Sequence, residues 1–325
     1  MRFQGIIDFI EANDRFILTA HETPDGDAIG SETALYRVLL KLGKQVRIYN
    51  ADEMAGKYLF IDPDKAVQVL TEDCGLPEDL SEWVLIILDT NDTNNIGNVS
   101  SSVLPGVKNY FIFDHHESGE NIVTGNLIES DASSTCELLY ELFTEIGVEI
   151  DLETAQALYV GIVYDTGSFI YPKTTAKTFH IAEALVSMGV SPNHVYAKIY
   201  ESNSISSLML QSRVLSSLEL YYDDGVAVQT MLKETLIECN AIFEEADTLI
   251  NIPLKSEKIR VSVFFKENRE GVLRCSMRSK GNINVAEIAQ LYGGGGHKTA
   301  AGFKSSFPLE TIKDKVLEML KPYFS

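Results

Sequence analysis

Short apolar runs alternate with longer amphipathic stretches through the first part of the chain. Four of these runs have the length and composition of buried strands. They cover residues 16–20, 46–49, 83–88 and 110–113. After the first run, Ile29, Leu35, Val38 and Leu39 recur with helical spacing until Gly43 ends the pattern. This alternation of strand and helix signals predicts an α/β fold, with a mostly parallel sheet and helices on both of its faces.

The pattern changes in the second part of the chain. Helical spacing continues over 134–147, 151–163 and 174–188, and Ser134 with Glu137 has the spacing of a capping box. From about residue 215 strand patterns return, followed by helical patterns at 284–292 and 309–320. We therefore predict two α/β domains joined by a helical linker, with the active-site cleft between the domains. Their predicted ranges are 1–190, 191–214 for the linker, and 215–325.

Composition restricts the class of protein. The chain has 325 residues, 45% of them apolar, and a formal net charge of −20. It shows no apolar run of membrane-spanning length and no signal-peptide pattern, so we expect a cytoplasmic protein without membrane contact. Such an excess of negatively charged residues argues against binding of long nucleic acid. Basic residues gather between 255 and 304, which favours a short or small phosphate substrate.

Metal-competent side chains follow three of the predicted strands. In open α/β sheets ligands bind outside the carboxyl ends of the strands, so we expect these side chains to meet. They are His21, Asp25, Asp27, Asp89, Asp114, His115 and His116, to which the helix-borne Asp165 is added. Two divalent ions ~3.5–4 Å apart can activate a water and neutralise a phosphoryl group. Oxygen-rich ligation without thiolate favours Mn²⁺ or Mg²⁺.

Each of these residues has a simpler interpretation when it is taken alone. Asp25-Gly26 is typical of an ordinary turn, and Asp27 could cap the following helix. Asp89 could be a plain strand-end carboxylate, and either histidine could be a packing residue. The joint placement at successive strand ends favours a polynuclear metal site over these alternatives.

A second cluster lies near the C-terminus. Consecutive glycines allow backbone N–H groups to converge on an anion, and an alternating strand upstream places Arg274, Ser276 and Arg278 on one face. We predict that Arg278 makes a bidentate phosphate contact. The predicted substrate-binding residues are Ser276, Arg278, Gly294, Gly295, Gly296, His297 and Lys298. The alternative is a flexible glycine hinge beside a solvated strand.

The motifs together resemble the DHH phosphoesterase superfamily. The segment 21–31, Asp89, the Asp114-His115-His116 triplet and the segment 161–169 are similar to its four motifs in order. Residues 293–303, GGGGHKTAAGF, resemble its DHH-associated domain of the first type. The length is most similar to bacterial bifunctional oligoribonucleases, called nano-RNases, that are also pAp phosphatases.

This resemblance implies two manganese ions, although Mg²⁺ or Co²⁺ is also compatible with the ligands. One ion would be held by His21, Asp25 and Asp89, and the other by Asp27, Asp89, His115 and Asp165. The resemblance further implies that Asp114 orients the imidazoles and that His116 contacts the substrate or acts on its proton. One position departs from the pattern, because Asn95 stands where members often carry an arginine.

The implied activity is hydrolysis of RNA of about 2–5 nucleotides to 5′-mononucleotides, and of pAp to AMP. The alternative within the superfamily is a phosphodiesterase for linear or cyclic dinucleotides such as pApA, pGpG or c-di-AMP. A homodimer is compatible with either activity. A non-catalytic nucleotide sensor is the rival from another class, and the complete ligand set argues against it.

Overall fold

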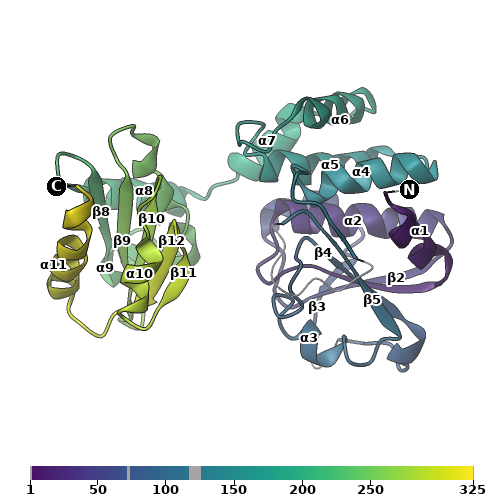
Figure 1. Cartoon of the computed structure of the whole chain (residues 1–325), viewed down its shortest axis with the longest axis horizontal. Helices are drawn as coiled ribbons and strands as arrows, with labels where there is room; N and C mark the ends of the chain where they lie inside the picture. The colour runs from purple at the N-terminus through teal and green to yellow at the C-terminus, as the bar shows by residue number, and fades with distance from the viewer. Residues whose placement is uncertain (1, 72–73, 117–125, 325) are drawn as a thin grey trace. The chain divides into compact units, whose positions relative to one another are not determined.

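The computed structural model of the chain describes residues 2–71, 74–116 and 126–324. It divides into two compact units, Met1–Ser202 and Asn203–Ser325. Each unit contains a sheet of six strands with its own helices (Figure 1). The mixed α/β fold predicted from the sequence is confirmed for both parts of the chain.

The first unit is built on a parallel sheet with the order β3-β2-β1-β4-β5-β6. Every recorded strand pair in this sheet is parallel. The strands are β1 (Arg15–Thr19), β2 (Gln45–Asn50), β3 (Val67–Val69), β4 (Val84–Leu88), β5 (Asn109–Asp114) and β6 (Leu127–Ile128). Chain order reverses its direction between β1 and β4, so these two strands form the switch point of the sheet.

The strands of the first sheet are buried on both faces, which explains their continuous apolar runs. Phe16 and Leu18 face the larger core, whereas Ile17 between them faces the smaller one. Helices of the larger core are α1 (Gln4–Glu11), α2 (Gly26–Lys41), α4 (Thr135–Ile146), α5 (Leu152–Asp165), α6 (Ala176–Ser187) and α7 (Pro192–Tyr200). The short helix α3 (Val99–Ser102) covers the smaller core. Helices therefore lie on both faces, as predicted, but unequally.

Capping residues fix where the helices around the site begin. Asp25 caps α2 by accepting hydrogen bonds from the N–H groups of Asp27 and Ala28. Ser134 caps α4 by accepting one from the N–H of Glu137. The carboxylate of Glu137, however, accepts from Ser133 Oγ and Thr178 Oγ1, so only half of the predicted capping box forms.

The second unit is a mixed sheet with the order β11-β12-β10-β9-β8-β7. Its strands are β7 (Glu219–Tyr221), β8 (Val226–Met231), β9 (Val261–Glu267), β10 (Leu273–Ser279), β11 (Gly295–His297) and β12 (Ala300–Lys304). One face packs on α10 (Val285–Gln290) and α11 (Leu309–Leu320). The other packs on α8 (Ile205–Ser216), α9 (Lys233–Glu238) and short 3-10 turns between 243 and 255.

The glycine-rich segment contains regular structure, which the flexible hinge considered above does not have. Gly295–His297 forms an edge strand that pairs antiparallel with β12. Glycine is required at two positions, because a Cβ on Gly294, just before the strand, or on Gly296 within it would lie 2.2 Å or 2.4 Å from a backbone carbonyl oxygen. The glycines thus permit a close approach of two backbones rather than general flexibility.

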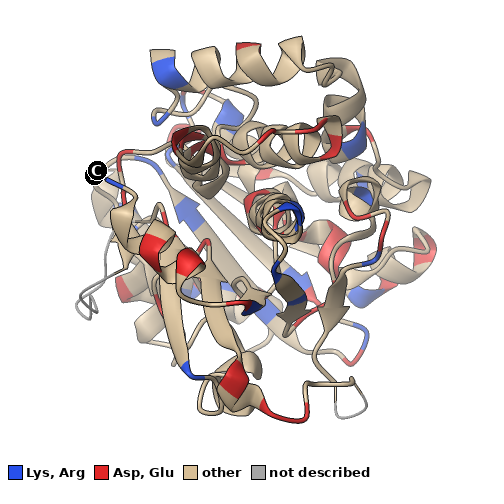
Figure 2. Ribbon diagram, turned by 90° about the vertical axis from the view of Figure 1, so that its right-hand side faces the viewer, with Lys and Arg blue, Asp and Glu red and all other residues tan. Residues whose placement is uncertain are grey.

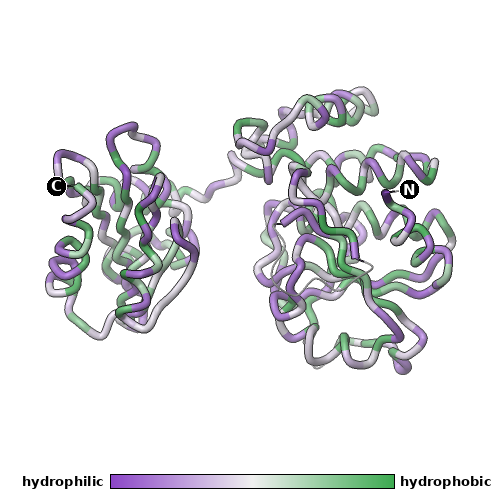
Figure 3. Tube along the Cα trace, viewed as in Figure 1, coloured by the Kyte–Doolittle hydropathy of each residue, from purple (hydrophilic) through white to green (hydrophobic). Residues whose placement is uncertain are grey.

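Charge and hydropathy follow the layers of each unit. Hydrophobic positions concentrate along the central strands and the inner helix faces (Figure 3). Acidic positions are spread over helices and loops rather than confined to one segment (Figure 2). No helix in the described part of the chain combines the length and the apolar character needed to cross a membrane.

Candidate active site

The candidate site lies at the carboxyl ends of three neighbouring strands. β1 pairs with β4, and β4 pairs with β5, so the residues after these strands are brought side by side. His21 follows β1, Asp89 follows β4, and His115 follows β5. The site therefore sits beside the switch point of the sheet, where ligands bind in open α/β folds.

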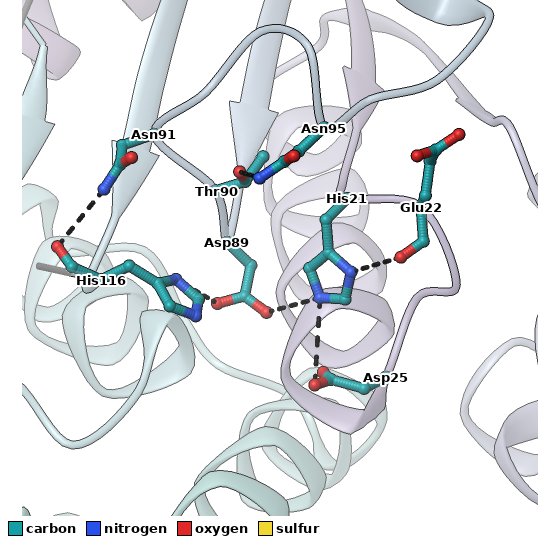
Figure 4. A pocket seen from close by; sticks show the side chains of 8 residues that line it. All are labelled: His21, Glu22, Asp25, Asp89, Thr90, Asn91, Asn95 and His116. Carbon is teal, nitrogen blue, oxygen red and sulfur yellow. Dashed lines mark hydrogen bonds and ion pairs between the residues drawn. The ribbon is translucent and has the colours of Figure 1, made fainter. Parts of the chain in front are cut away.

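Asp89 lies at the centre of the cluster and its two oxygens face different partners. Its Oδ2 is 3.5 Å from Nε2 of His21, and its Oδ1 is 3.5 Å from Nε2 of His115. In Figure 4 the carboxylate lies between the imidazoles of His21 and His116. The residue has a left-handed backbone (φ 59°) and is almost fully buried. Strain of this kind at a buried carboxylate is common in functional sites.

The predicted ligands fall into overlapping groups in which one ligand atom from each residue lies within 4.8 Å of the others. The first group is His21, Asp25 and Asp89, and the second is Asp27, His115 and Asp165. A third group joins Asp89 and His115 with His116. The cluster is consistent with divalent metal binding, and Asp89 lies within reach of both main groups.

Backbone carbonyls fix the ring orientation of His21 and His115. Nδ1 of His21 lies 2.7 Å from the carbonyl oxygen of Glu22, and Nδ1 of His115 lies 3.3 Å from that of Ala132. A carbonyl accepts only, so these contacts require a hydrogen on Nδ1, and in the neutral ring the lone pair is then on Nε2. Nε2 is the atom that each ring turns toward the carboxylates, as a metal ligand requires.

Crowding of carboxylates changes the acidity of the whole cluster. Burial, together with the charges of Asp89 and Asp165, raises the pKa of Asp27 well above its ordinary value. Burial and the charge of Asp89 raise the pKa of Asp25 to about 6. Burial disfavours the charged form of His115, but Asp165 and the neighbouring aspartates outweigh it and raise its pKa to about 9. Bound divalent cations would relieve this repulsion.

The N-terminus of α4 donates hydrogen bonds to two of the carboxylates. Backbone N–H groups of Thr135 and Cys136 donate to the two oxygens of Asp27 at 2.6 and 3.0 Å. The Thr135 hydroxyl donates to Oδ1 of Asp89 at 2.9 Å. Sequence reasoning missed Thr135. The available signal was a run of three hydroxyl residues, Ser133 to Thr135, where a helix cap needs only one.

Asp114 and His116 form a pair beside the cluster. Nδ1 of His116 lies 2.8 Å from Oδ1 of Asp114, whose side chain is fully buried. Burial alone would raise the pKa of Asp114, but the hydrogen bonds and charge of His116, together with the charge of His115, outweigh it and the pKa is lowered. About half of the His116 side chain is exposed, so its ring can reach a substrate.

An open cavity of about 480 Å³ gives access to the cluster. His21, Asp25, Asp89 and His116 line one side of this cavity, together with Glu22, Thr90, Asn91 and Asn95 (Figure 4). Asn95 is the position that departs from the motif pattern described above. Its carbonyl oxygen accepts from the N–H of Glu22 at 2.7 Å, so it fixes the loop after β1. The wall of the cavity is thus neutral at Asn95 and carries a carboxylate at Glu22.

The predicted substrate-binding residues belong to the second unit. Ser276 and Gly294 line one cavity there, and Gly295, Gly296 and His297 form β11. Arg278 is partly buried, with Nη1 donating to its neighbour's carbonyl oxygen at 3.1 Å. Lys298 is exposed directly after the strand. These residues share one end of the second sheet, and their part in substrate binding stays a prediction.

Comparison with known families matches both units. Residues 15–162 match the model of the DHH family, N-terminal domain, and residues 223–325 match that of the DHHA1 domain. The Bacillus subtilis bifunctional oligoribonuclease and PAP phosphatase NrnA is 28% identical over 300 residues, which are 91% of either chain. The Listeria monocytogenes cyclic-di-AMP phosphodiesterase PdeA is 28% identical over 92% of this chain but only 46% of its own length.

A solved structure resembles the whole chain. An exopolyphosphatase-related protein from Bacteroides fragilis superposes with a TM-score of 0.89 and 27% sequence identity. The match covers 99% of this chain and 97% of the other. The two-unit architecture is therefore shared along the full length.

Proposed function

Since the chain belongs to the DHH phosphoesterase family and carries a DHHA1 domain, we propose that it hydrolyses short RNA oligonucleotides to 5′-mononucleotides and removes the 3′-phosphate of pAp. The arrangement that supports this most is the cluster around Asp89, whose two oxygens face two groups of ligands. Similarity to the Bacillus oligoribonuclease and PAP phosphatase along 91% of both chains supports this choice of substrates.

The donor set fits two divalent ions, with manganese preferred. His21 and Asp25 would hold one ion. The other ion would be held by Asp27, His115 and Asp165, and Asp89 would contribute to both sites. Bound ions would supply the Lewis acidity that phosphate-ester hydrolysis needs and lower the pKa of a water. Carboxylates with imidazole nitrogens and no thiolate are the ligands that Mn²⁺ accepts readily.

The residues around the cluster have separate tasks in this proposal. Asp114 holds Nδ1 of His116 and so directs Nε2 of that ring away from itself. His116 would then contact the substrate or move its proton. Arg278, Gly294 and the strand Gly295–His297 would hold phosphate and nucleotide, with Ser276 and Lys298 as further donors.

An activity panel tests the proposal. Purified protein with Mn²⁺ is given pAp, RNAs of two to ten nucleotides, pApA, pGpG and c-di-AMP, and kcat/KM is measured for each substrate. We expect cleavage of pAp and of RNAs up to about five nucleotides, and none with the isosteric Asp89→Asn variant. Wild-type protein that left both pAp and short RNA intact would exclude the proposed function.

The second candidate is a dinucleotide phosphodiesterase. The Listeria cyclic-di-AMP phosphodiesterase matches 92% of this chain, which favours it, but this match spans only 46% of that protein. In the same panel this candidate requires kcat/KM for a cyclic or linear dinucleotide to exceed that for tri- to pentaribonucleotides. The reverse order supports the oligoribonuclease.

A further inference from the structure

Three cationic side chains lie side by side across the second sheet. The register places Arg274 of β10 opposite Lys266 of β9 and also opposite Lys304 of β12. Residues that are directly opposite in antiparallel strands project from the same face, with Cβ atoms ~4.5–5.5 Å apart. We call these residues the basic row. Like charges in such positions destabilise a sheet, so a neutralising partner is expected for each.

Only one member of the basic row has its charge matched inside the protein. Lys266 is buried, forms an ion pair with Asp247, and lies 4.7 Å from the ring centre of Phe243. Arg274 stacks on the same ring, 5.4 Å from its centre. Within the described ranges, neither Arg274 nor Lys304 has a carboxylate at ion-pair distance. Two neighbouring exposed cations therefore remain uncompensated, in a chain whose net charge is −20.

Both of these cations line a cavity of about 490 Å³. It is lined by Arg274 and Lys304, by Ser276 in the next row, and by Tyr292, Gly293 and Gly294 at its edge. The ring of Tyr292 stacks on Phe303, with the ring centres 4.7 Å apart, on the face that packs against α10 and α11. Two cations and the Ser276 hydroxyl suit a phosphodiester. The volume is within the range of small-ligand sites.

The basic row is separate from the phosphate contact assigned to Arg278. Arg274 and Arg278 lie on one face of β10 but four residues apart, which is roughly 14 Å at 3.4 Å per residue. Two guanidinium groups at that spacing suit two different phosphates. We propose that Arg274 and Lys304 form a subsite for a second phosphodiester of a bound oligonucleotide, one that is not cleaved. The inference rests on the proposed oligoribonuclease function.

A subsite of this kind makes substrate length matter. A substrate of three or more nucleotides has a phosphodiester available for it beyond the one being cut, whereas pAp has no phosphodiester. The test uses Arg274→Gln with Lys304→Gln in the full chain. Its matched control is Lys315→Gln with Lys321→Gln, two exposed lysines on α11 and the turn after it. α11 packs against the opposite face of the sheet, so the control removes the same charge elsewhere.

We expect KM for tri- and pentaribonucleotides to rise about tenfold in the Arg274/Lys304 variant, as loss of a charged hydrogen bond predicts. KM for pAp should stay within about twofold, and the control should match wild type on every substrate. The salt dependence of pentanucleotide binding should also weaken, by about 0.7 in log–log slope for each lost phosphate contact. Equal losses on pAp and pentanucleotide, or no loss on either, would overturn the proposal.

Direct binding separates this inference from the proposed function. Fluorescence anisotropy with a labelled pentaribonucleotide, in Ca²⁺ to slow any cleavage, compares wild type, variant and control. If wild type cleaves nothing, the proposed function fails, and the binding comparison still decides on the subsite. Weaker binding by the variant alone supports the subsite. Equal binding by all three proteins rejects it.

Discussion

The Thr135 hydroxyl donates a hydrogen bond to Oδ1 of Asp89 across 2.9 Å, from the first turn of α4 to the end of β4. Because both groups are buried, this bond fixes a carboxylate that belongs to one main ligand group and lies 3.5 Å from His115 of the other. The same turn holds Asp27 through backbone N–H groups. The helix thus sets the positions of two proposed ligands.

Thr135→Val removes the hydroxyl and keeps the shape of the side chain. We expect the apparent Kd for Mn²⁺ to rise about fivefold, as the loss of ~1 kcal/mol from one hydrogen bond predicts. Thr135→Ser retains the hydroxyl and should stay near wild type. Mn²⁺ titrations of activity and of unfolding temperature measure both variants. An unchanged midpoint in Thr135→Val would show that the bond does not position Asp89.

Gly161→Ala places a methyl group where α5 meets the site. Its Cβ would lie 2.4 Å from Oδ1 of Asp27 and 2.3 Å from Sγ of Cys136, both in buried surroundings. We expect a loss of about 1–3 kcal/mol in unfolding free energy, typical of overpacking, together with weaker metal binding. Gly56→Ala is the control, because a Cβ there meets nothing within 4 Å. Urea unfolding curves that coincide for the two variants would contradict the prediction.

Glu32 makes stability depend on pH. Its side chain is fully buried, its Oε2 accepts from Asn50 Nδ2 at 2.9 Å, and burial raises its pKa to about 8. The charge of His21 opposes this shift, and the charges of Asp62 and Asp89 add to it. Folding therefore favours the protonated carboxyl.

This contribution to stability is complete below the unfolded-state pKa near 4.5 and is lost as pH rises through about 8. Glu32→Gln cannot ionise. We therefore expect its unfolding free energy to rise relative to that of wild type by up to about 1.4 kcal/mol per pH unit between the unfolded-state and folded-state pKa values. Urea unfolding of the metal-free proteins at several pH values measures the difference. The exposed Glu145→Gln serves as control, and a pH-independent difference for Glu32→Gln would refute the protonated state.

Asp114 and His116 should act as one unit. Asp114→Asn weakens the 2.8 Å contact that orients the imidazole, and we expect kcat on pAp to fall about 10- to 100-fold. His116→Ala should cost at least as much. The double variant should lose little more than His116→Ala alone, because an orienting residue has no effect without its partner. Losses that multiply would show that the two side chains act independently.

The central part of the site could be predicted because it obeys a rule of the sheet. His21, Asp89 and His115 each follow an apolar run, and parallel strands bring their carboxyl ends to one edge. The contacts from α4 could not be predicted in this way. Thr135 is separated from Asp27 by 108 residues, and no periodicity shows toward which carboxylates a helix start will point.

Two further features could not be predicted from the sequence, for related reasons. Glu32 lies in the predicted helix, but its bond to Asn50 depends on how α2 rotates above β2. The glycines at 293–296 allowed a flexible hinge as one interpretation, because a glycine tract does not distinguish a flexible backbone from two closely paired ones. In both cases the missing information is tertiary packing, which overrides local propensity.

The attachment of His21, Asp89 and His115 to three adjacent strands has a consequence for how this kind of enzyme can diversify. The distances between these residues are set by the hydrogen-bonded pairing of the strands, which lie ~4.8 Å apart. On the proposed assignment of nucleotide contacts to the second unit, mutations there would alter which nucleotide is held while the metal-ligand cluster stays unchanged. Relatives named for different substrates, such as PAP and cyclic-di-AMP, accord with such a separation of chemistry from recognition.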